Sequence, residues 1–202
     1  PIHSSAASDV YKRQSFIRMS EDTYLIAYYG YNSGIKHDGT SVSNTWGQWL
    51  SVFQIKSDGS VINELGNFLH DTYTNSDPYN DLIKIDDDTY ALAYKSYNYG
   101  PQTSGSWGGW IKTFKVNGGN INQVNELQHY TSSDSYWHSW ERLSATTYAL
   151  AWQGSGGDGY ITTFTISTDG ATITEISELE HDGNNGSYNS FAKLDDDTYV
   201  LA

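Results

Sequence analysis

The segment DDDTYALA, residues 86–93, decides the fold because it recurs along the chain. It returns as EDTYLIA at residues 21–27, as ATTYALA at residues 145–151 and as DDDTYVLA at residues 195–202. Four copies of a Thr-Tyr pair, each followed by small and aliphatic residues, indicate a protein built by repetition. The chain is therefore interpreted one repeat at a time.

Each complete repeat predicts four short strands. A first strand, such as DLIKI from Asp81, leads through a polar turn into the Thr-Tyr strand. A third strand, such as WIKTFKV from Trp110, begins with an aromatic residue and carries a Phe four positions later. Asp-Gly or Gly-Gly pairs then predict a hairpin into the fourth strand. No segment shows a sustained helical period, so the expected class is all-β.

Radially repeated four-stranded antiparallel sheets are the arrangement found in β-propellers. With periods of 66, 58 and 51 residues between the repeated tyrosines, the chain resembles β-propeller repeat proteins whose blades have kelch-like length. The resemblance covers residues 15–202 and implies antiparallel four-stranded blades in an open arc, not a closed ring. It implies blades at about residues 15–71, 72–130 and 131–182, and a partial blade at residues 183–202. It brings no functional signature, and we carry over no catalytic residue.

The first fourteen residues, PIHSSAASDVYKRQ, match no part of the repeat. They resemble a translated linker from sequence assembly, so we expect residues 1–14 to be a non-native or disordered leader. The last copy of the repeat stops at Ala202, inside a segment that is a complete strand in the earlier copies. We therefore expect a fragment of a longer protein, whose missing blades would be partners of this one.

Charge and composition exclude several classes of partner. The chain has 24 acidic and 11 basic residues and a formal net charge of -13, which argues against nucleic acid and anionic membrane surfaces. It has no cysteine, so thiolate metal sites and disulfides are excluded. No apolar run is long enough to span a bilayer. Acidity together with abundant Tyr, Thr, Ser, Asn and Gly favours an extracellular or cell-surface location.

All large differences in repeat length fall between the second and third strands, at residues 29–48, 95–109 and 153–159. Repeat-specific insertions on one face usually mark a binding surface. Aromatic side chains beside Asn, Asp and His in these segments, and in the blade connections predicted on the same face, favour a ligand that offers both an apolar face and polar groups. The candidate ligand-binding residues are Tyr31, Asn32, His37, Asp38, Trp46, Tyr97, Asn98, Tyr99, Trp107 and His138.

These features favour a non-enzymatic, extracellular propeller that binds a glycan or another extracellular ligand. Two alternatives stay open. One is a structural or protein-interaction module of a larger adhesin-like protein, and the other is a propeller glycosidase or lyase. A glycosidase would need two neighbouring carboxylates on the loop face. The available ones are Asp38, Asp77, Asp134 and Asp158.

Other repeated residues are assigned structural roles. The acidic turns could bind Ca²⁺, but their spacing favours solvated turns, so no cofactor or metal is expected. The repeated aromatics Tyr79, Trp137 and Tyr188 are predicted to pack blade against blade. Histidines at strand ends are predicted to make structural hydrogen bonds, and basic residues six positions before each repeat tyrosine to pair with acids. The histidines are His70, His129 and His181, and the basic residues are Arg18, Lys84, Arg142 and Lys193.

Overall fold

The computed structural model describes residues 14–72, 79–98 and 106–202, with only the backbone at Asn98 and Ser106. The predicted leader therefore lies outside the described residues except for Gln14. Within these residues almost all of the regular structure is β-strand, and the one helical element is a 3₁₀ turn at Ser155–Gly157. In the part of the chain described, no helix is long and apolar enough to cross a membrane.

The strands form three four-stranded antiparallel sheets and one two-stranded sheet. In each sheet the neighbouring strands follow one another in chain order. The strands are β1 (Ser15–Arg18), β2 (Thr23–Lys36), β3 (Ser41–Ile55) and β4 (Ile62–Asp71) in the first sheet; β5 (Asp81–Lys84), β6 (Thr89–Asn98), β7 (Ser106–Asn117) and β8 (Asn120–Tyr130) in the second; β9 (Tyr136–Arg142), β10 (Thr147–Gln153), β11 (Gly159–Ile166) and β12 (Ile173–Asp182) in the third; and β13 (Phe191–Lys193) and β14 (Tyr199–Leu201) in the last.

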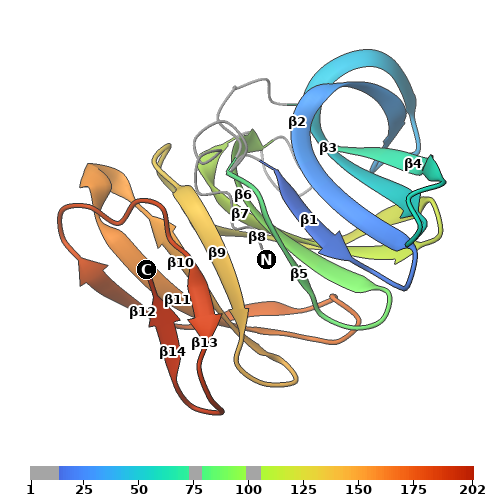
Figure 1. Ribbon diagram of the computed structural model, residues 1–202. Coiled ribbons are helices and arrows are strands. Elements are labelled where there is room, and N and C mark those ends of the chain that lie inside the picture. Colours follow the sequence, from blue (N-terminus) through green and yellow to red (C-terminus); the bar gives the residue numbers. More distant parts are fainter. Residues whose placement is uncertain (1–13, 73–78, 99–105) are drawn as a thin grey trace.

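The four sheets stand side by side as successive blades of an open arc (Figure 1). The strands β1, β5, β9 and β13 are neighbours in that order, so they form the inner side of the arc. The sheet β1–β4 lies at one end of the arc and β13–β14 at the other. The predicted all-β class and the propeller-like open arc of four-stranded blades are confirmed.

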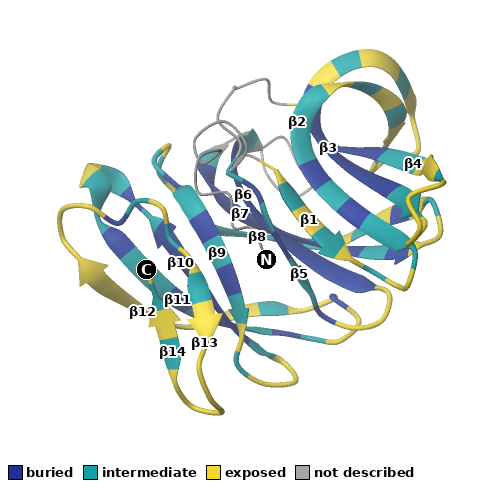
Figure 2. Ribbon diagram, viewed as in Figure 1, coloured by how far each residue is buried: buried dark blue, intermediate teal, exposed yellow. Residues whose placement is uncertain are grey.

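The Thr-Tyr strand packs against both neighbouring blades because its alternate side chains face opposite ways. In β6, Tyr90, Leu92 and Tyr94 belong to the core shared with the first blade, whereas Ala91 and Ala93 belong to the core shared with the third. All five side chains are fully buried, as the dark strands at the centre of Figure 2 show. Large residues on one face and small ones on the other let the blades stack closely.

Glycines at the predicted hairpin turns adopt the left-handed backbone that these turns require. Gly59, Gly118 and Gly170 have φ angles of 72°, 57° and 76°. A residue with a Cβ atom would be strained there, whereas glycine is not. The turn residues therefore fix where the third and fourth strands of each blade meet.

The insertion at residues 29–48 is not the open loop that the sequence predicts. It extends β2 and β3 into a long hairpin that curls around the first blade (Figure 1). Near its tip Ile35 pairs in parallel with Phe68, on the free edge of β4. Gly34 permits the contact, because a Cβ atom at this position would meet the carbonyl oxygen of Asn67. The hairpin thus protects a blade edge.

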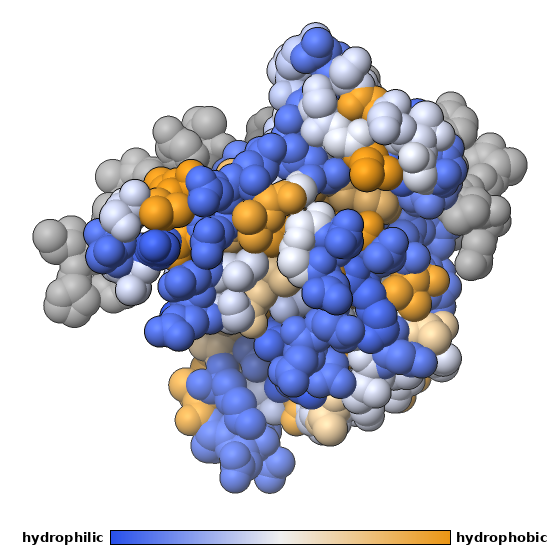
Figure 3. Space-filling view, turned by 90° about the vertical axis from the view of Figure 1, so that its right-hand side faces the viewer, coloured by the Kyte–Doolittle hydropathy of each residue, from blue (hydrophilic) through white to orange (hydrophobic). Residues whose placement is uncertain are grey.

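The outer surface beside this hairpin is mainly hydrophilic. Figure 3 shows its hydrophobic residues as separate groups among hydrophilic ones, not as one continuous patch. A scattered distribution of this kind is ordinary for a protein surface and does not by itself mark an interface.

The basic residues at the ends of the inner strands contact the polar turns that follow them, through ion pairs or hydrogen bonds. Lys84 lies 3.6 Å from Asp87 and Lys193 lies 3.9 Å from Asp196, so the prediction of acid partners is correct for both lysines. Arg18 and Arg142 instead donate hydrogen bonds to backbone carbonyls of the turn, at 2.6 to 3.0 Å. A guanidinium offers several donors in a fixed fork, which suits two adjacent carbonyls.

Candidate functional site

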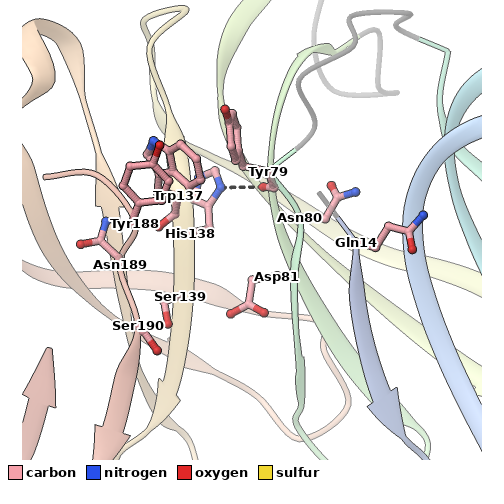
Figure 4. A pocket seen from close by; sticks show the side chains of 10 residues that line it. All are labelled: Gln14, Tyr79, Asn80, Asp81, Trp137, His138, Ser139, Tyr188, Asn189 and Ser190. Carbon is pink, nitrogen blue, oxygen red and sulfur yellow. Dashed lines mark hydrogen bonds between the residues drawn. The ribbon is translucent and has the colours of Figure 1, made fainter. Parts of the chain in front are cut away.

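The inner strands begin at a repeated triplet of residues that the arc brings together. The triplets are residues 79–81, 137–139 and 188–190, and each has an aromatic residue, then Asn or His, then Asp or Ser. In the first repeat the last two positions are Gln14 and Ser15. Because the inner strands are neighbours, the triplets lie next to one another, as Figure 4 shows for nine of these residues and Gln14.

The third residue of each triplet links its blade to the next. The hydroxyl of Ser15 accepts a hydrogen bond from the backbone N–H of Leu82 at 2.9 Å. The carboxylate of Asp81 accepts one from the N–H of Trp140 at 2.7 Å, and Ser139 accepts one from the N–H of Phe191 at 3.0 Å. We call this contact the inter-blade hydrogen bond. It satisfies a backbone donor of the neighbouring inner strand.

The second residue of the triplet binds the preceding blade. Nδ1–H of His138 donates to the carbonyl of Tyr79 at 2.9 Å, and its Nε2 accepts from the hydroxyl of Ser135 at 2.9 Å. Asn189 likewise donates to the carbonyl of Trp137, at 3.2 Å. His138, a candidate ligand-binding residue, therefore holds the segment that connects the second and third blades. Burial lowers the pKa of the His138 imidazole to about 4, so the ring is neutral at physiological pH.

Asn80 occupies the same position in the second blade and is 5% exposed. Neither polar atom of its side chain has a hydrogen-bond partner within the described part of the protein. By the repeat, the matching carbonyl would belong to Arg13, which lies outside the described residues.

The first residues of the triplets form a row of aromatic rings. The ring centroids of Tyr79 and Trp137 are 4.3 Å apart, and those of Trp137 and Tyr188 are 4.0 Å apart. Trp137 and Tyr188 have φ angles of 56° and 64°, in the left-handed region. This conformation costs about 1 to 3 kcal/mol for a bulky residue. The predicted blade-to-blade packing of these aromatics is confirmed, and the backbone is strained where it occurs.

A cavity of about 220 Å³ opens between the triplets (Figure 4). Its volume corresponds to roughly seven water molecules in the liquid, so it can accept a small ligand. Its walls are residues 79–81, 137–139, 188–190 and Gln14. None of these ten residues is Lys or Arg, and the one acid among them is Asp81.

Asp81 carries a carboxyl group with unusual acidity. Burial raises its pKa from 3.8 to about 6, and hydrogen bonds from Trp140, Ser15 and Leu82 offset part of the increase. A group with this pKa can both accept and release a proton near neutral pH. The sequence did not identify Asp81 as a candidate, although it is the one acid in a column that otherwise holds Ser15, Ser139 and Ser190.

The predicted ligand residues of the first insertion lie on the curled hairpin and do not line the cavity. Trp46 packs against Tyr29 and Tyr31, with ring centroids 5.5 and 5.4 Å apart, so these rings stabilise the paired strands. At the tip, the carboxylate of Asp38 accepts the backbone N–H of Thr40 at 2.8 Å, and this bond lowers its pKa. The candidates on this hairpin are Tyr31, Asn32, His37, Asp38 and Trp46.

The second insertion repeats this arrangement on a smaller scale. Tyr97 and Trp107 face each other across β6 and β7, with ring centroids 5.5 Å apart. Asn98 is at the end of β6, and Tyr99 lies outside the described residues. Of the ten candidates, the structure places only His138 in the wall of the cavity.

Two of the three repeated histidines, His70 and His129, do not make the predicted structural hydrogen bonds in the described part of the chain. Both ring nitrogens of His70 and of His129 are buried without a partner. The rings instead pack edge-on against aromatic residues, Tyr94 and Trp152 respectively. Burial accordingly lowers the pKa of both histidines well below the usual value. Within the described ranges no group of three or more His, Cys, Asp or Glu residues could hold a metal ion.

Comparison with known proteins does not assign this chain to a family. No protein-family model matches the chain, and no curated protein matches it. Among solved structures, a Bacteroides fragilis protein provisionally named a 6-phosphogluconolactonase is similar, with a TM-score of 0.32 and 8% sequence identity. The match covers 82% of this chain and 70% of that one.

Two predictions from the sequence are wrong. The sequence predicts a glycan-binding or adhesive propeller and a protein that is not an enzyme, whereas the similar solved structure bears the name of an enzyme. The structure adds a physical reason, because the aromatic residues that suggested glycan binding pack against each other across hairpins. The polar groups that do converge are on the inner strands.

Proposed function

We propose that this protein is an enzyme that hydrolyses a small ester or lactone in the cavity between the inner strands. Asp81 is the general base, and the row formed by Tyr79, Trp137 and Tyr188 is the apolar wall that holds the substrate. The hydroxyls of Ser139 and Ser190, which line the same cavity, are the hydrogen-bond donors for the substrate carbonyl. The proposal rests on the position and acidity of one carboxyl group.

The observation that carries it is that Asp81 differs from its counterparts. The inter-blade hydrogen bond needs a single acceptor, and Ser15 and Ser139 supply it with a neutral hydroxyl. A partly buried carboxylate costs free energy that a hydroxyl does not, unless a cation compensates it. None of the described residues that line the cavity is Lys or Arg. The contact between blades therefore does not require a carboxylate at position 81.

The proposed reaction needs only water. The Asp81 carboxylate takes a proton from a water molecule while the water oxygen bonds to the carbonyl carbon of the substrate. The bond between that carbon and the leaving oxygen then breaks, and Asp81 returns the proton to the leaving oxygen. One water molecule is consumed, and the carboxylate is regenerated.

The cavity does not suit a phosphorylated substrate, such as the name of the similar structure implies for that protein. Phosphate groups are bound by Arg, Lys or clusters of backbone N–H groups. In the described part of the chain the cavity walls include no Arg or Lys, His138 is neutral, and the full sequence carries a net charge of -13. We therefore expect substrates without a negative charge.

The test compares the chain with Asp81→Ser and Asp81→Asn on a panel of small uncharged esters and lactones, with hydrolysis followed by a pH indicator. Asp81→Ser keeps the acceptor that the neighbouring blades use. We expect hydrolysis whose rate increases with pH around 6 in the parent chain and falls by about 100-fold or more in both variants. Asp134→Asn, a change outside the cavity wall, should leave the rate unchanged.

Equal rates in the parent and in both Asp81 variants would overturn the proposal, and so would the absence of hydrolysis across the whole panel. Two further proposals follow from composition alone. We propose that the protein acts outside the cell, and that nucleic acid is not among its partners because of its negative charge.

A further inference from the structure

The hairpin between β7 and β8 differs from its counterparts in the first and third blades. It turns through Gly118 and Gly119, which directly follow Asn117 at the end of β7. In the other two blades the turn contains an Asp-Gly pair, and the N–H groups of Gly59 and Gly170 each donate to a backbone carbonyl, at 2.9 and 2.8 Å. Within the described residues the N–H of Gly118 donates no hydrogen bond. The second blade therefore leaves the peptide nitrogen that follows Asn117 without a partner in the fold.

Asn117 and Gly118 form one of the two Asn-Gly pairs in the sequence, and Asn185 and Gly186 form the other. Asn is a thermolabile residue, and a following glycine favours its reaction, because no Cβ atom shields the next nitrogen and the backbone moves freely. Asn117 and Gly118 are both exposed. Gly186 is buried, and its N–H donates to the carbonyl of Gly157 at 2.7 Å. The structure thus distinguishes two pairs that are alike in sequence.

We propose that Asn117 is a modification site, at which the folded chain loses ammonia without an enzyme and an isoaspartate forms. The nitrogen of Gly118 bonds to Cγ of Asn117, the bond between Cγ and the side-chain nitrogen breaks, and the proton from Gly118 leaves with that nitrogen as ammonia. A five-membered imide remains. One water molecule then opens the imide at either of its two carbonyl carbons, and the chain carries one new carboxylate.

The carbon that water attacks decides the product. Attack at Cγ returns the ordinary backbone with an aspartate side chain. Attack at the backbone carbonyl carbon of residue 117 leaves the Gly118 nitrogen bonded to Cγ, which gives isoaspartate. The main chain then runs through Cβ and Cγ and is one atom longer. The reaction consumes one water molecule, releases one ammonia and needs no oxidant, metal or cofactor.

The hairpin that would change is in contact with the first blade. A Cβ atom added at Gly66, in β4, would overlap the carbonyl oxygen of Gly119, and one added at Gly119 would overlap the carbonyl oxygen of Leu65. The two backbones therefore touch, with no side chain between them that could adjust to a displacement. An additional main-chain atom at position 117 lengthens the chain just before Gly119. Isoaspartate should therefore disturb the packing of the second blade on the first.

To test the proposal, the folded chain is incubated at mildly alkaline pH, where the peptide nitrogen loses its proton more readily, and each Asn is followed by mass spectrometry of its peptides. The Gly186 nitrogen must first be released from burial and from its hydrogen bond. We therefore expect ammonia loss at Asn117 to be at least about tenfold faster than at Asn185. An isoaspartyl methyltransferase with S-adenosylmethionine identifies the isoaspartate product.

Two variants complete the design. Asn117→Gln keeps an amide at this position but would have to close a larger ring, so it should stop the reaction there and leave Asn185 unchanged. Asn117→Asp carries the charge of the ordinary product without the additional main-chain atom, so it should unfold at nearly the same urea concentration as the fresh parent chain. The parent chain enriched in isoaspartate should unfold at a lower urea concentration than both.

Equal rates of ammonia loss at Asn117 and Asn185, or a faster reaction at Asn185, would overturn the proposal. If the incubated chain carries isoaspartate at position 117 but unfolds at the same urea concentration as the fresh chain, the effect on packing between the first two blades is wrong. Neither result depends on the proposed hydrolysis, because the hairpin and the cavity between the inner strands share no residue.

Discussion

Replacing Asp81 by Ser should make the folded chain more stable at pH 7 while it removes the proposed base. The substitution gives the second blade the residue that the first and third blades have at this position, Ser15 and Ser139. A Ser hydroxyl can accept the backbone N–H of Trp140, as those two hydroxyls accept their own partners. The inter-blade hydrogen bond is thus kept, and the buried charge is lost.

The magnitude follows from the acidity of Asp81. A pKa raised from 3.8 to about 6 means that ionising this group costs the folded state about 3 kcal/mol. The hydrogen bond from Ser15 Oγ to the carboxylate, at 3.2 Å, is lost in the variant and takes back about 1 kcal/mol. We therefore expect a net gain of about 2 kcal/mol at pH 7.

The stability difference between the parent chain and Asp81→Ser should depend on pH. Because the folded-state pKa of Asp81 is raised, its ionisation cost is fully present above about pH 6 and disappears as the pH falls toward 3.8. The advantage of Asp81→Ser should therefore decrease between pH 6 and pH 4. Urea denaturation followed by tryptophan fluorescence at several pH values measures it.

Asp87→Ser is the matched control, since the side chain of Asp87 is fully exposed in the turn of the same blade. It should change stability by less than about 0.5 kcal/mol at every pH. The reasoning is refuted if Asp81→Ser destabilises the protein at pH 7, or if its effect is the same at pH 7 and pH 4. Either result would mean that the carboxylate is needed for structure.

Three further changes test other parts of the fold. His138→Asn should make the stability of the protein less sensitive to acid. The folded-state pKa of His138, about 4, lies below the ordinary 6.5, so this residue lowers the free energy of unfolding by about 3 kcal/mol as the pH falls from 6.5 to 4. If the variant and the parent chain lose stability equally over that range, the reasoning is wrong. Glu126→Gln should lower the free energy of unfolding by about 3 kcal/mol in urea titrations at pH 7, because it leaves the buried Lys112 ammonium, 3.7 Å away, without its carboxylate partner. A loss below about 1 kcal/mol would contradict the importance of this ion pair. Gly66→Ala should lower thermal stability by about 1 to 3 kcal/mol, since its Cβ would overlap the carbonyl oxygen of Gly119 in the next blade, and an unaltered melting temperature would count against that contact.

The sequence predicts the blades well because their determinants are local. Alternation of Tyr90, Ala91 and Leu92 assigns each side chain to a face, and the hairpin glycines Gly59 and Gly170 fix the turns. It does not predict the curled hairpin at residues 29–48, because the return of its tip to β4 depends on contacts between segments distant in the chain. Repeat length alone cannot distinguish an open loop from a paired extension.

The site was missed for a related reason. The triplets that form the cavity are separated by about 50 residues or more, and only the packing of inner strands brings them together. The aromatic members, Tyr79, Trp137 and Tyr188, were correctly paired with each other but assigned to packing alone. The available signal was the alignment of the third position, where Asp81 stands in a column of serines.

In a repeat protein, the residues at equivalent positions of the other repeats show which differences serve the fold and which serve function. Lys112 also departs from its column, which holds Ser51 and Thr162, but Glu126 compensates its buried charge in an ion pair. When a residue differs from its counterparts in the other repeats and has a compensating partner, packing within the fold explains the difference. Asp81 instead has neutral hydrogen-bond donors and, among the described residues, no cation in the cavity wall, and burial raises its pKa. Because the described cavity wall supplies no compensating cation, the Asp81 carboxylate is available to interact with a ligand.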